Sequence, residues 1–170
     1  QAIRAAVIDP ATFSGRVMAH ALERAGLERS SPEIPVPVAD DADDFEAARP
    51  LVAVTTTLKD ALRRCNADSH NLYAEALLKR TGHEVTGEPG SWANGGAVVR
   101  MLLSERLGPE HATGVVVADG SGYSRLNRVQ PRTLALWLAS LARDAEVAAP
   151  LIASMPRPGQ GTLRNRFGSA

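Results

Sequence analysis

The residues of this chain best suited to chemistry are Ser69 and Asn71, which place a hydroxyl and a carboxamide two positions apart. They stand in a polar break between two segments whose apolar residues recur at helical spacing. A hydroxyl and a carboxamide held at such a junction suit a polar corner of an acyl-transfer site. The alternative is that the pair only caps the helix ends, since Ser and Asn are favoured there for local hydrogen bonding.

A second polar segment runs from Asp119 to Arg125 and is dense in glycine. Glycines on both sides of Ser121 allow close backbone approach. Arg125 offers a planar fork of donors that matches a carboxylate. The alternative is a tight turn after a strand, with Arg125 simply at the surface.

Other polar and aromatic residues carry weaker signals. The histidines have no metal-ligand spacing, and no paired cysteines or carboxylate cluster accompany them, so the sequence predicts neither a metal nor another cofactor. Glu75 is interpreted as a solvated or paired carboxylate, and Trp92 and Trp137 as core anchors. The four histidines are His20, His70, His83 and His111.

The elements that must position these residues are mostly helices. Asp9 and Pro10 predict a helix start, with Gly26 as its stop. A capping box at 57–60 predicts a helix that ends near Asn66. The next predicted helices run from about 72 to a stop at Gly82, from about 91 to 107, and onward from Pro131. The residues predicted to face inward are Leu58, Ala61, Leu62, Cys65, Leu72, Tyr73, Ala76 and Leu77. In the helix from Pro131, the apolar residues at helical spacing are Leu134, Leu138, Leu141 and Ala142.

Apolar runs at 51–55 and 114–118 predict two buried strands. The pattern as a whole indicates an α/β protein in which helices outnumber strands. A chain of 170 residues that is 44% hydrophobic can build one domain with a sizeable core.

The charge balance argues against two classes of binding partner. The formal net charge is zero, so nucleic acid and anionic membrane surfaces are poor partners. The only marked charge run, at 40–44, lies beside a proline-spaced stretch and predicts a solvated connector. Cys65 is the only cysteine, which excludes an intrachain disulfide but leaves the compartment open.

Four blocks, in order along the chain, resemble the serine D-Ala-D-Ala carboxypeptidases of the penicillin-binding S13 peptidase family. The first resembles that family's Ser-Asp-Asn-Leu-x-Ala-Glu segment and the third its Asp-Gly-Ser-Gly-Leu-Ser-Arg block. The fourth resembles the segment that precedes its Lys-Thr-Gly strand. The blocks are 68–75, Gly90-Ser91-Trp92, 119–128 and 161–167.

The resemblance implies part of a β-lactamase/transpeptidase-like fold, with helices packed on an antiparallel sheet, incomplete in this chain. It implies a serine nucleophile that forms an acyl-enzyme with peptidoglycan stem peptides and with β-lactam antibiotics. Ser69 would relay a proton toward the leaving amine, and Asn71 would hydrogen-bond the substrate backbone. Arg125 would hold the polar end of the stem peptide, with Ser121 and Tyr123 along the same wall. The implied location is extracytoplasmic, in the periplasm or cell wall.

The departures from the family pattern matter equally. The chain contains no Ser-x-x-Lys and no Lys-Thr-Gly, and His70 and Tyr123 replace the usual Asp and Leu. We therefore expect a fragment of a longer precursor, inactive by itself within an active parent enzyme. The alternative is a non-catalytic peptidoglycan-binding module derived from the family. The expected organisation is a helical segment at 1–29, an acidic Pro-rich connector at 30–49 and a partial transpeptidase-like domain at 50–170.

Overall fold

Helix α1 (Pro10–Arg24) begins and ends where its capping residues predict. The computed structural model describes residues 7–28 and 52–167, and the predicted connector at 30–49 lies outside them. The Asp9 side chain accepts a hydrogen bond from the Thr12 amide at 3.1 Å. Gly26, with φ of 89°, follows the end of the helix. These features confirm the predicted start and stop. Helix α1 belongs to a separate compact unit, residues 1–53.

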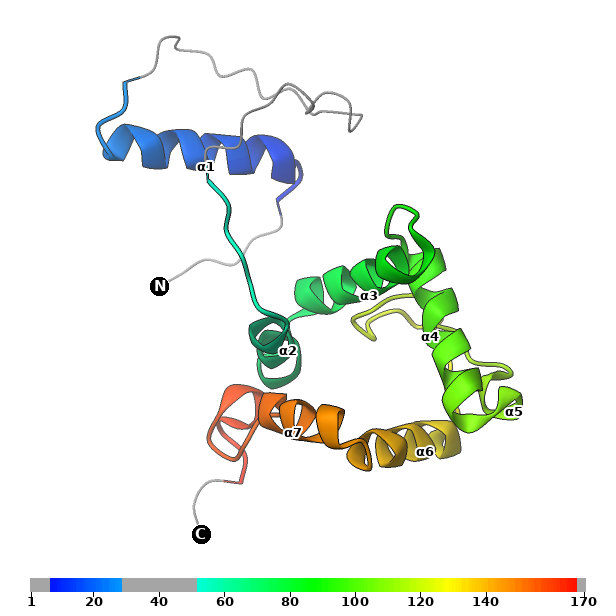
Figure 1. Ribbon diagram of the computed structural model, residues 1–170. Coiled ribbons are helices and arrows are strands. Elements are labelled where there is room, and N and C mark those ends of the chain that lie inside the picture. Colours follow the sequence, from blue (N-terminus) through cyan, green and yellow to red (C-terminus); the bar gives the residue numbers. More distant parts are fainter. Residues whose placement is uncertain (1–6, 29–51, 168–170) are drawn as a thin grey trace. The chain divides into compact units, whose positions relative to one another are not determined.

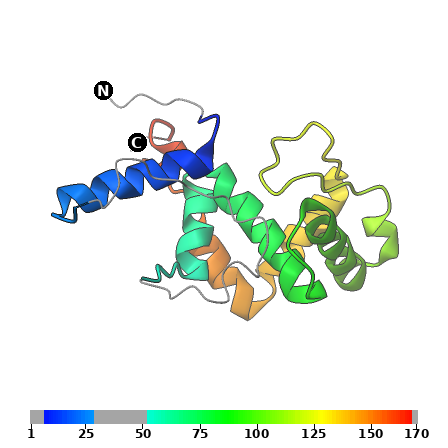
Figure 2. The same cartoon turned by 90° about the horizontal axis from the view of Figure 1, so that it is seen from above.

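The second unit, residues 54–170, is a ring of helices (Figures 1 and 2). Successive contacts join α2 to α3, α3 to α4, α4 to α6 and α6 to α7, and α7 returns to α2. The helices are α2 (Leu58–Ala67), α3 (Asn71–Thr86), α4 (Trp92–Leu107), α5 (Pro109–Ala112), α6 (Pro131–Ala142) and α7 (Ala145–Ser154), with a short 3₁₀ helix at Gly161–Leu163.

Local capping sets the starts of two helices in this ring. The Thr57 hydroxyl accepts from the Asp60 amide at 3.1 Å and opens α2, as predicted. The Ser91 hydroxyl accepts from the Asn94 amide at 3.1 Å, and the Asn94 side chain accepts from the Ser91 amide at 2.8 Å. This reciprocal pair is a capping box, so α4 starts as its sequence predicts.

The predicted stop of α3 at Gly82 is wrong. The helix continues to Thr86 and ends at Gly87, whose φ of 74° is left-handed. Gly82 is needed for packing instead, because a Cβ there would lie 2.7 Å from the Gly95 amide nitrogen. Gly95 in turn leaves no room for a side chain, since its Cβ would lie 2.5 Å from the Leu78 carbonyl oxygen. Helices α3 and α4 therefore approach backbone to backbone.

The two predicted strands do not form in the part of the chain that the structure describes. Residues 52–57 have no regular structure. Within 114–118, only Val116 pairs, in a single antiparallel bridge with Arg128 whose two hydrogen bonds are both 2.9 Å. A strand needs a neighbour along its whole length, and the described residues provide one partner residue. The sheet of the predicted α/β class is thus not observed.

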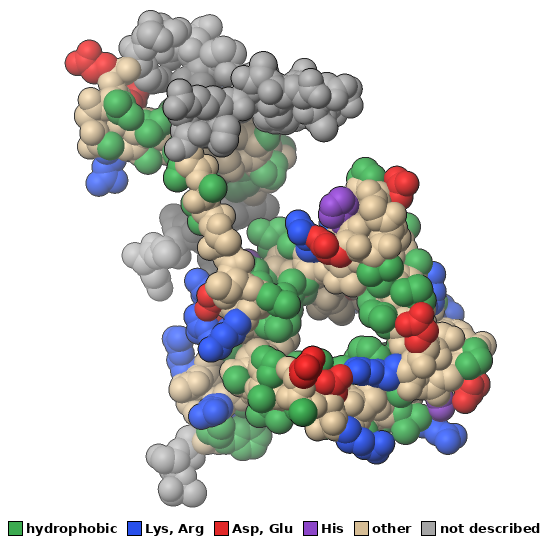
Figure 3. All heavy atoms as spheres, viewed as in Figure 1, with side chains coloured by type: hydrophobic (Ala, Val, Ile, Leu, Met, Phe, Trp, Pro, Cys, Tyr) green, Lys and Arg blue, Asp and Glu red, His purple; other side chains and the backbone are tan. Residues whose placement is uncertain are grey.

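Few apolar side chains in the second unit are fully covered. Within 54–167, the buried hydrophobic side chains are Leu78, Val98, Leu103 and Val115. Three residues predicted to face inward are instead exposed, namely Leu58 by 64%, Leu72 by 71% and also Ala76, and Leu134 and Leu138 are nearly half exposed. Figure 3 shows an open centre whose border includes many hydrophobic side chains, with acidic and basic ones among them. Helical periodicity thus indicates which side chains share an apolar face, but much of that surface is exposed among the described residues.

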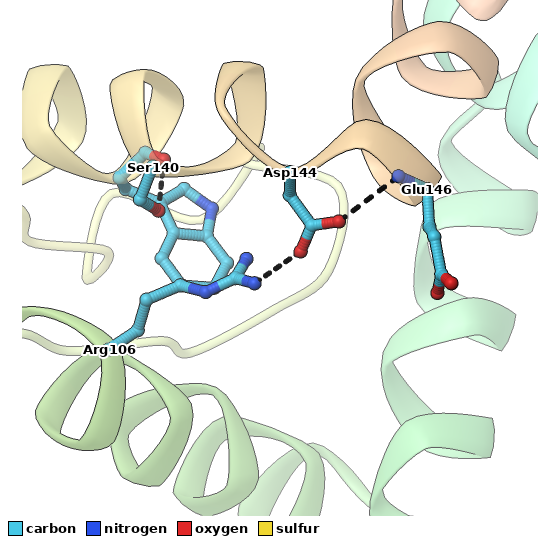
Figure 4. Close-up of polar contacts among 5 residues, drawn as sticks. Arg106, Ser140, Asp144 and Glu146 are labelled. Carbon is cyan, nitrogen blue, oxygen red and sulfur yellow. Dashed lines mark hydrogen bonds and ion pairs between the residues drawn. The ribbon is translucent and has the colours of Figure 1, made fainter.

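An ion pair ties α4 to the corner between α6 and α7 (Figure 4). The Arg106 guanidinium donates to the Asp144 carboxylate at 2.6 Å and lies 5.8 Å from the centre of the Trp137 ring. Asp144 also accepts from the Glu146 amide at 3.2 Å and so caps α7. One carboxylate therefore serves both the helix cap and the contact that helps to close the ring.

Candidate active site

The junction between α2 and α3 presents Ser69 and Asn71 to solvent. Asp68 is the C-cap of α2, and His70 is the N-cap of α3 but makes no side-chain capping bond. Neither the Ser69 hydroxyl nor the Asn71 carboxamide hydrogen-bonds to another of the described residues. The helix-capping interpretation of this pair is therefore wrong: its polar groups are left available.

The backbone at Ser69 is unusual, with φ of +53°. A non-glycine residue in this left-handed region costs on the order of 1 to 3 kcal/mol, and such residues cluster at functional sites. The turn directs the chain straight into α3, which starts at Asn71. The strain thus falls on the residue whose hydroxyl the sequence singles out.

The loop from Asp119 to Arg125 is organised around the Asp119 carboxylate. It accepts hydrogen bonds from the Ser124 amide at 2.6 Å, the Gly122 amide at 2.8 Å and the Asn127 carboxamide at 2.6 Å. Burial raises the pKa of Asp119, but these hydrogen bonds favour the charged form more strongly, so its pKa lies below the ordinary value. The loop is wound around an ionised carboxylate.

This winding leaves two of the three predicted binding side chains exposed. Tyr123 is 85% exposed, and Arg125 is exposed. Arg125 makes no ion pair or hydrogen bond with the described residues, so its guanidinium is available to a ligand. Ser121 is half-buried, and its hydroxyl donates to Asp119 at 3.3 Å.

Glu75, which the sequence predicts to be a solvated or paired carboxylate, joins three of the four resembling blocks. It lies on α3 within the first block. Its carboxylate accepts from the Trp92 indole at 2.8 Å, the Gly120 amide at 2.9 Å and the Ser121 amide at 3.2 Å. Burial raises the pKa of Glu75, but these donors lower the pKa by more, so the carboxyl stays ionised. Its place within the quoted block was the only sequence signal for this role.

Trp92 is not the core anchor that the sequence predicts. Its side chain is 52% exposed, and its ring is held between two groups of α3. Lys79 Nζ lies 4.1 Å from the ring centre, a cation–π contact, while Glu75 accepts the indole proton. Trp92 therefore fastens the start of α4 to α3.

The fourth block packs beside the same helix junction. Gly161 lies directly against the carbonyl of Ala67, the last residue of α2, and a Cβ there would collide with it. Close by, the Asn66 carboxamide donates to the Ser154 hydroxyl at 2.7 Å. The end of the described chain is thus held next to the turn that carries Ser69.

Of the predicted site residues, Asn71 lies on α3, Ser69 lies in the turn before it, and Ser121 is hydrogen-bonded to it through Glu75. Ser121 is bound to Glu75, one helical turn from Asn71. No hydrogen bond, ion pair or ring contact joins Ser69 or Asn71 to Tyr123 or Arg125 among the residues described here. His70 stacks edge-on with Tyr73 at 5.0 Å between ring centres. The arrangement forms two polar corners along one helix.

The order of the 119–125 loop should depend on pH. The pKa of Asp119 is lower in the folded chain than in the unfolded chain. Its ionised carboxylate therefore contributes fully to the stability of the folded loop above the unfolded-state pKa of about 3.9, and this contribution is lost as the pH falls through the folded-state pKa. We expect the amide NMR signals of Gly122 and Ser124 to hold steady from pH 7 to about 5 and to shift at more acidic pH. Asp119→Asn should abolish the transition, and the same transition in that variant would contradict the assignment.

In the stretches 7–28 and 52–167, no group of His, Cys, Asp and Glu side chains forms a candidate metal site. No helix there has the length and apolar character needed to cross a membrane.

Comparison with known proteins places these blocks in a family. The sequence model of the D-Ala-D-Ala carboxypeptidase 3 (S13) family matches residues 1–170. D-alanyl-D-alanine carboxypeptidase DacB of Haemophilus influenzae is 30% identical over 115 residues, which cover 65% of this chain and 23% of the relative.

The fold is similar to that of penicillin binding protein 4 (dacB) from Haemophilus influenzae, whose crystal structure is a complex with a novel β-lactam. The TM-score is 0.67 at 23% identity, over 95% of this chain and 35% of the other. The chain thus spans about a third or less of the length of either relative. The full-length family match and the order of the four blocks agree: this chain belongs to the D-Ala-D-Ala carboxypeptidase 3 (S13) family.

Proposed function

We propose that this chain is part of a serine D-Ala-D-Ala carboxypeptidase/endopeptidase, which cleaves peptidoglycan stem peptides through an acyl-enzyme and is acylated by penicillins. The observation that carries the proposal is the α2–α3 junction. Ser69 adopts a left-handed backbone, and its hydroxyl and the Asn71 carboxamide make no local hydrogen bond among the described residues. A strained turn with two available polar groups suits substrate contact better than helix capping.

In this mechanism a serine hydroxyl, supplied from outside this chain, gives its proton to the lysine of a Ser-x-x-Lys motif, and its oxygen attacks the carbonyl of the D-Ala-D-Ala bond. The tetrahedral intermediate collapses to an acyl-enzyme, the leaving amine takes up a proton, and water then releases the acyl group. Ser69 relays the proton to the amine, and Asn71 donates a hydrogen bond to the substrate backbone. These roles need groups that are exposed and preorganised, and both residues are exposed at a helix start.

The 119–125 loop forms the substrate wall. Arg125 binds the polar or charged end of the stem peptide, and its guanidinium has no competing partner among the described residues. Ser121 and Tyr123 line the same wall. Asp119 keeps the loop backbone in place through the amides of Gly122 and Ser124, so the exposed side chains start from a rigid turn.

The same proposal implies that the helices of the ring are covered by a sheet. The hydrophobic side chains bordering the open helical ring pack against an antiparallel sheet from the rest of a longer protein. The proposed domain organisation is a helical segment at 1–29, an acidic Pro-rich connector at 30–49 and a partial transpeptidase-like domain at 50–170. Its substrate, peptidoglycan, makes the location extracytoplasmic.

Labelled penicillin tests the proposed function. We expect the intact parent protein to become covalently labelled and the 170-residue chain to remain unlabelled, because the chain holds no Ser-x-x-Lys. The control is a denatured parent sample, in which the site is lost. Labelling of the chain alone would contradict the missing nucleophile. A parent protein that binds peptidoglycan but takes up no penicillin would instead indicate a binding module.

A further inference from the structure

The 119–125 loop is seated on α3 at one defined place. Gly120 lies against the Ala74 carbonyl, and a Cβ at Gly120 would also lie 2.9 Å from Leu78 Cβ. Any side chain there would lift the loop away from the helix. The loop backbone thus touches α3 on both sides of Glu75, independently of any hydrogen bond.

The Glu75 carboxylate fixes the same contact by hydrogen bonding. Its Oε2 accepts from the Gly120 amide at 2.9 Å and the Trp92 indole at 2.8 Å, and its Oε1 accepts from the Ser121 amide at 3.2 Å. Both oxygens are therefore occupied by donors from two other segments. A carboxylate in that position is poorly placed to take a proton from a substrate, because three of its roughly four acceptor sites are already engaged.

Glu75 also lies one helical turn after Asn71 on α3. Side chains at this spacing share a face of the helix. Glu75, which binds the loop at Ser121, therefore lies at a fixed distance along the helix from Asn71, whose carboxamide the proposed mechanism uses. A shift of the loop along α3 would change the separation between the two polar corners.

We propose that Glu75 is a positioning residue that holds the substrate wall, residues 119–125, in register with Ser69 and Asn71. This inference rests on the proposed function. Glu75 transfers no proton and contacts no substrate. It acts through the Gly120 and Ser121 amides, while Trp92 fastens the start of α4 to the same carboxylate. Misplacement of a substrate wall by about 1 Å can cost on the order of 100-fold in rate.

The first test uses amide hydrogen exchange in the 170-residue chain. In Glu75→Ala we expect the Gly120 and Ser121 amides to exchange at least about tenfold faster, because their acceptor is gone. The Ser124 amide should be unaffected, since Asp119 holds it. Glu75→Gln should give an intermediate rate, because one acceptor oxygen remains. The matched control is Glu84→Gln on the same helix, where Glu84 pairs with Arg80 at the surface.

The second test measures penicillin acylation of the intact enzyme. We expect Glu75→Ala to slow acylation at least about tenfold without changing the shape of the pH profile, and Glu75→Gln to recover most of the rate. A general base would instead lose a limb of that profile.

Two results would overturn the proposal: equal acceleration of exchange at Ser124 and Gly120, which indicates general unfolding, or an unchanged acylation rate in Glu75→Ala. A wild-type parent that penicillin does not label would overturn the proposed function. The exchange experiment would still test separately whether Glu75 holds the 119–125 loop.

Discussion

Replacing Asn71 with alanine should slow penicillin acylation of the intact enzyme by about 100- to 1,000-fold. This factor corresponds to the loss of one preorganised donor in an acyl-transfer site, about 2.7 to 4 kcal/mol. The effect is large because a donor fixed at a helix start needs no reorganisation in the transition state. Stopped-flow acylation with a chromogenic β-lactam measures it.

Stability is the control for this variant. Asn71 is exposed, and its side chain makes no hydrogen bond among the described residues, so Asn71→Ala should change the free energy of unfolding by less than about 0.5 kcal/mol. An unchanged acylation rate would remove Asn71 from the mechanism. A slower rate accompanied by a large loss of stability would assign it a structural role.

Leu78→Ala should lower the free energy of unfolding of the second unit by about 2 to 5 kcal/mol. Leu78 is 8% exposed and is one of the few buried apolar side chains. It lies where α4 and the 119–125 loop both meet α3, since a Cβ at Gly95 would lie 2.8 Å from its side chain and one at Gly120 2.9 Å. Truncation leaves a cavity where α4 and the 119–125 loop pack against α3. Urea denaturation of the 170-residue chain measures the loss.

Leu72→Ala provides the matched comparison, because Leu72 lies on the same helix and is 71% exposed. We expect its effect on the free energy of unfolding to stay within about 0.5 kcal/mol. If the two leucine variants lost equal stability, then the burial of Leu78 would not be the source of its effect.

Features determined by short-range contacts could be predicted from the sequence. Asp9, Thr57 and Ser91 each accept an amide three residues ahead, so their helix starts could be inferred from local residue types. The four ordered blocks likewise indicated the family, which the match over residues 1–170 confirms.

Where long-range packing competes with local preference, the predictions were wrong. Gly82 is locally typical of a helix stop, yet α3 continues through it because the glycine admits α4. The apolar run at 114–118 is typical of a strand, but a strand requires partners, and one bridge to Arg128 is all that the described residues supply. Helical spacing placed Leu72 on an apolar face, but it does not show which apolar side chains find a neighbour.

The sequence by itself determined the starts of α1, α2, α4 and α6, the family and the identity of Ser69 and Asn71 as candidates, but it did not indicate α5 or α7. Only the tertiary structure decided that these two side chains are not used as caps, and that Glu75 joins α3 to a loop 45 residues further along the chain. The physical reason is the range of the interaction: a cap is completed within one turn, whereas the Glu75 link exists only after α3, α4 and the 119–125 loop have packed together.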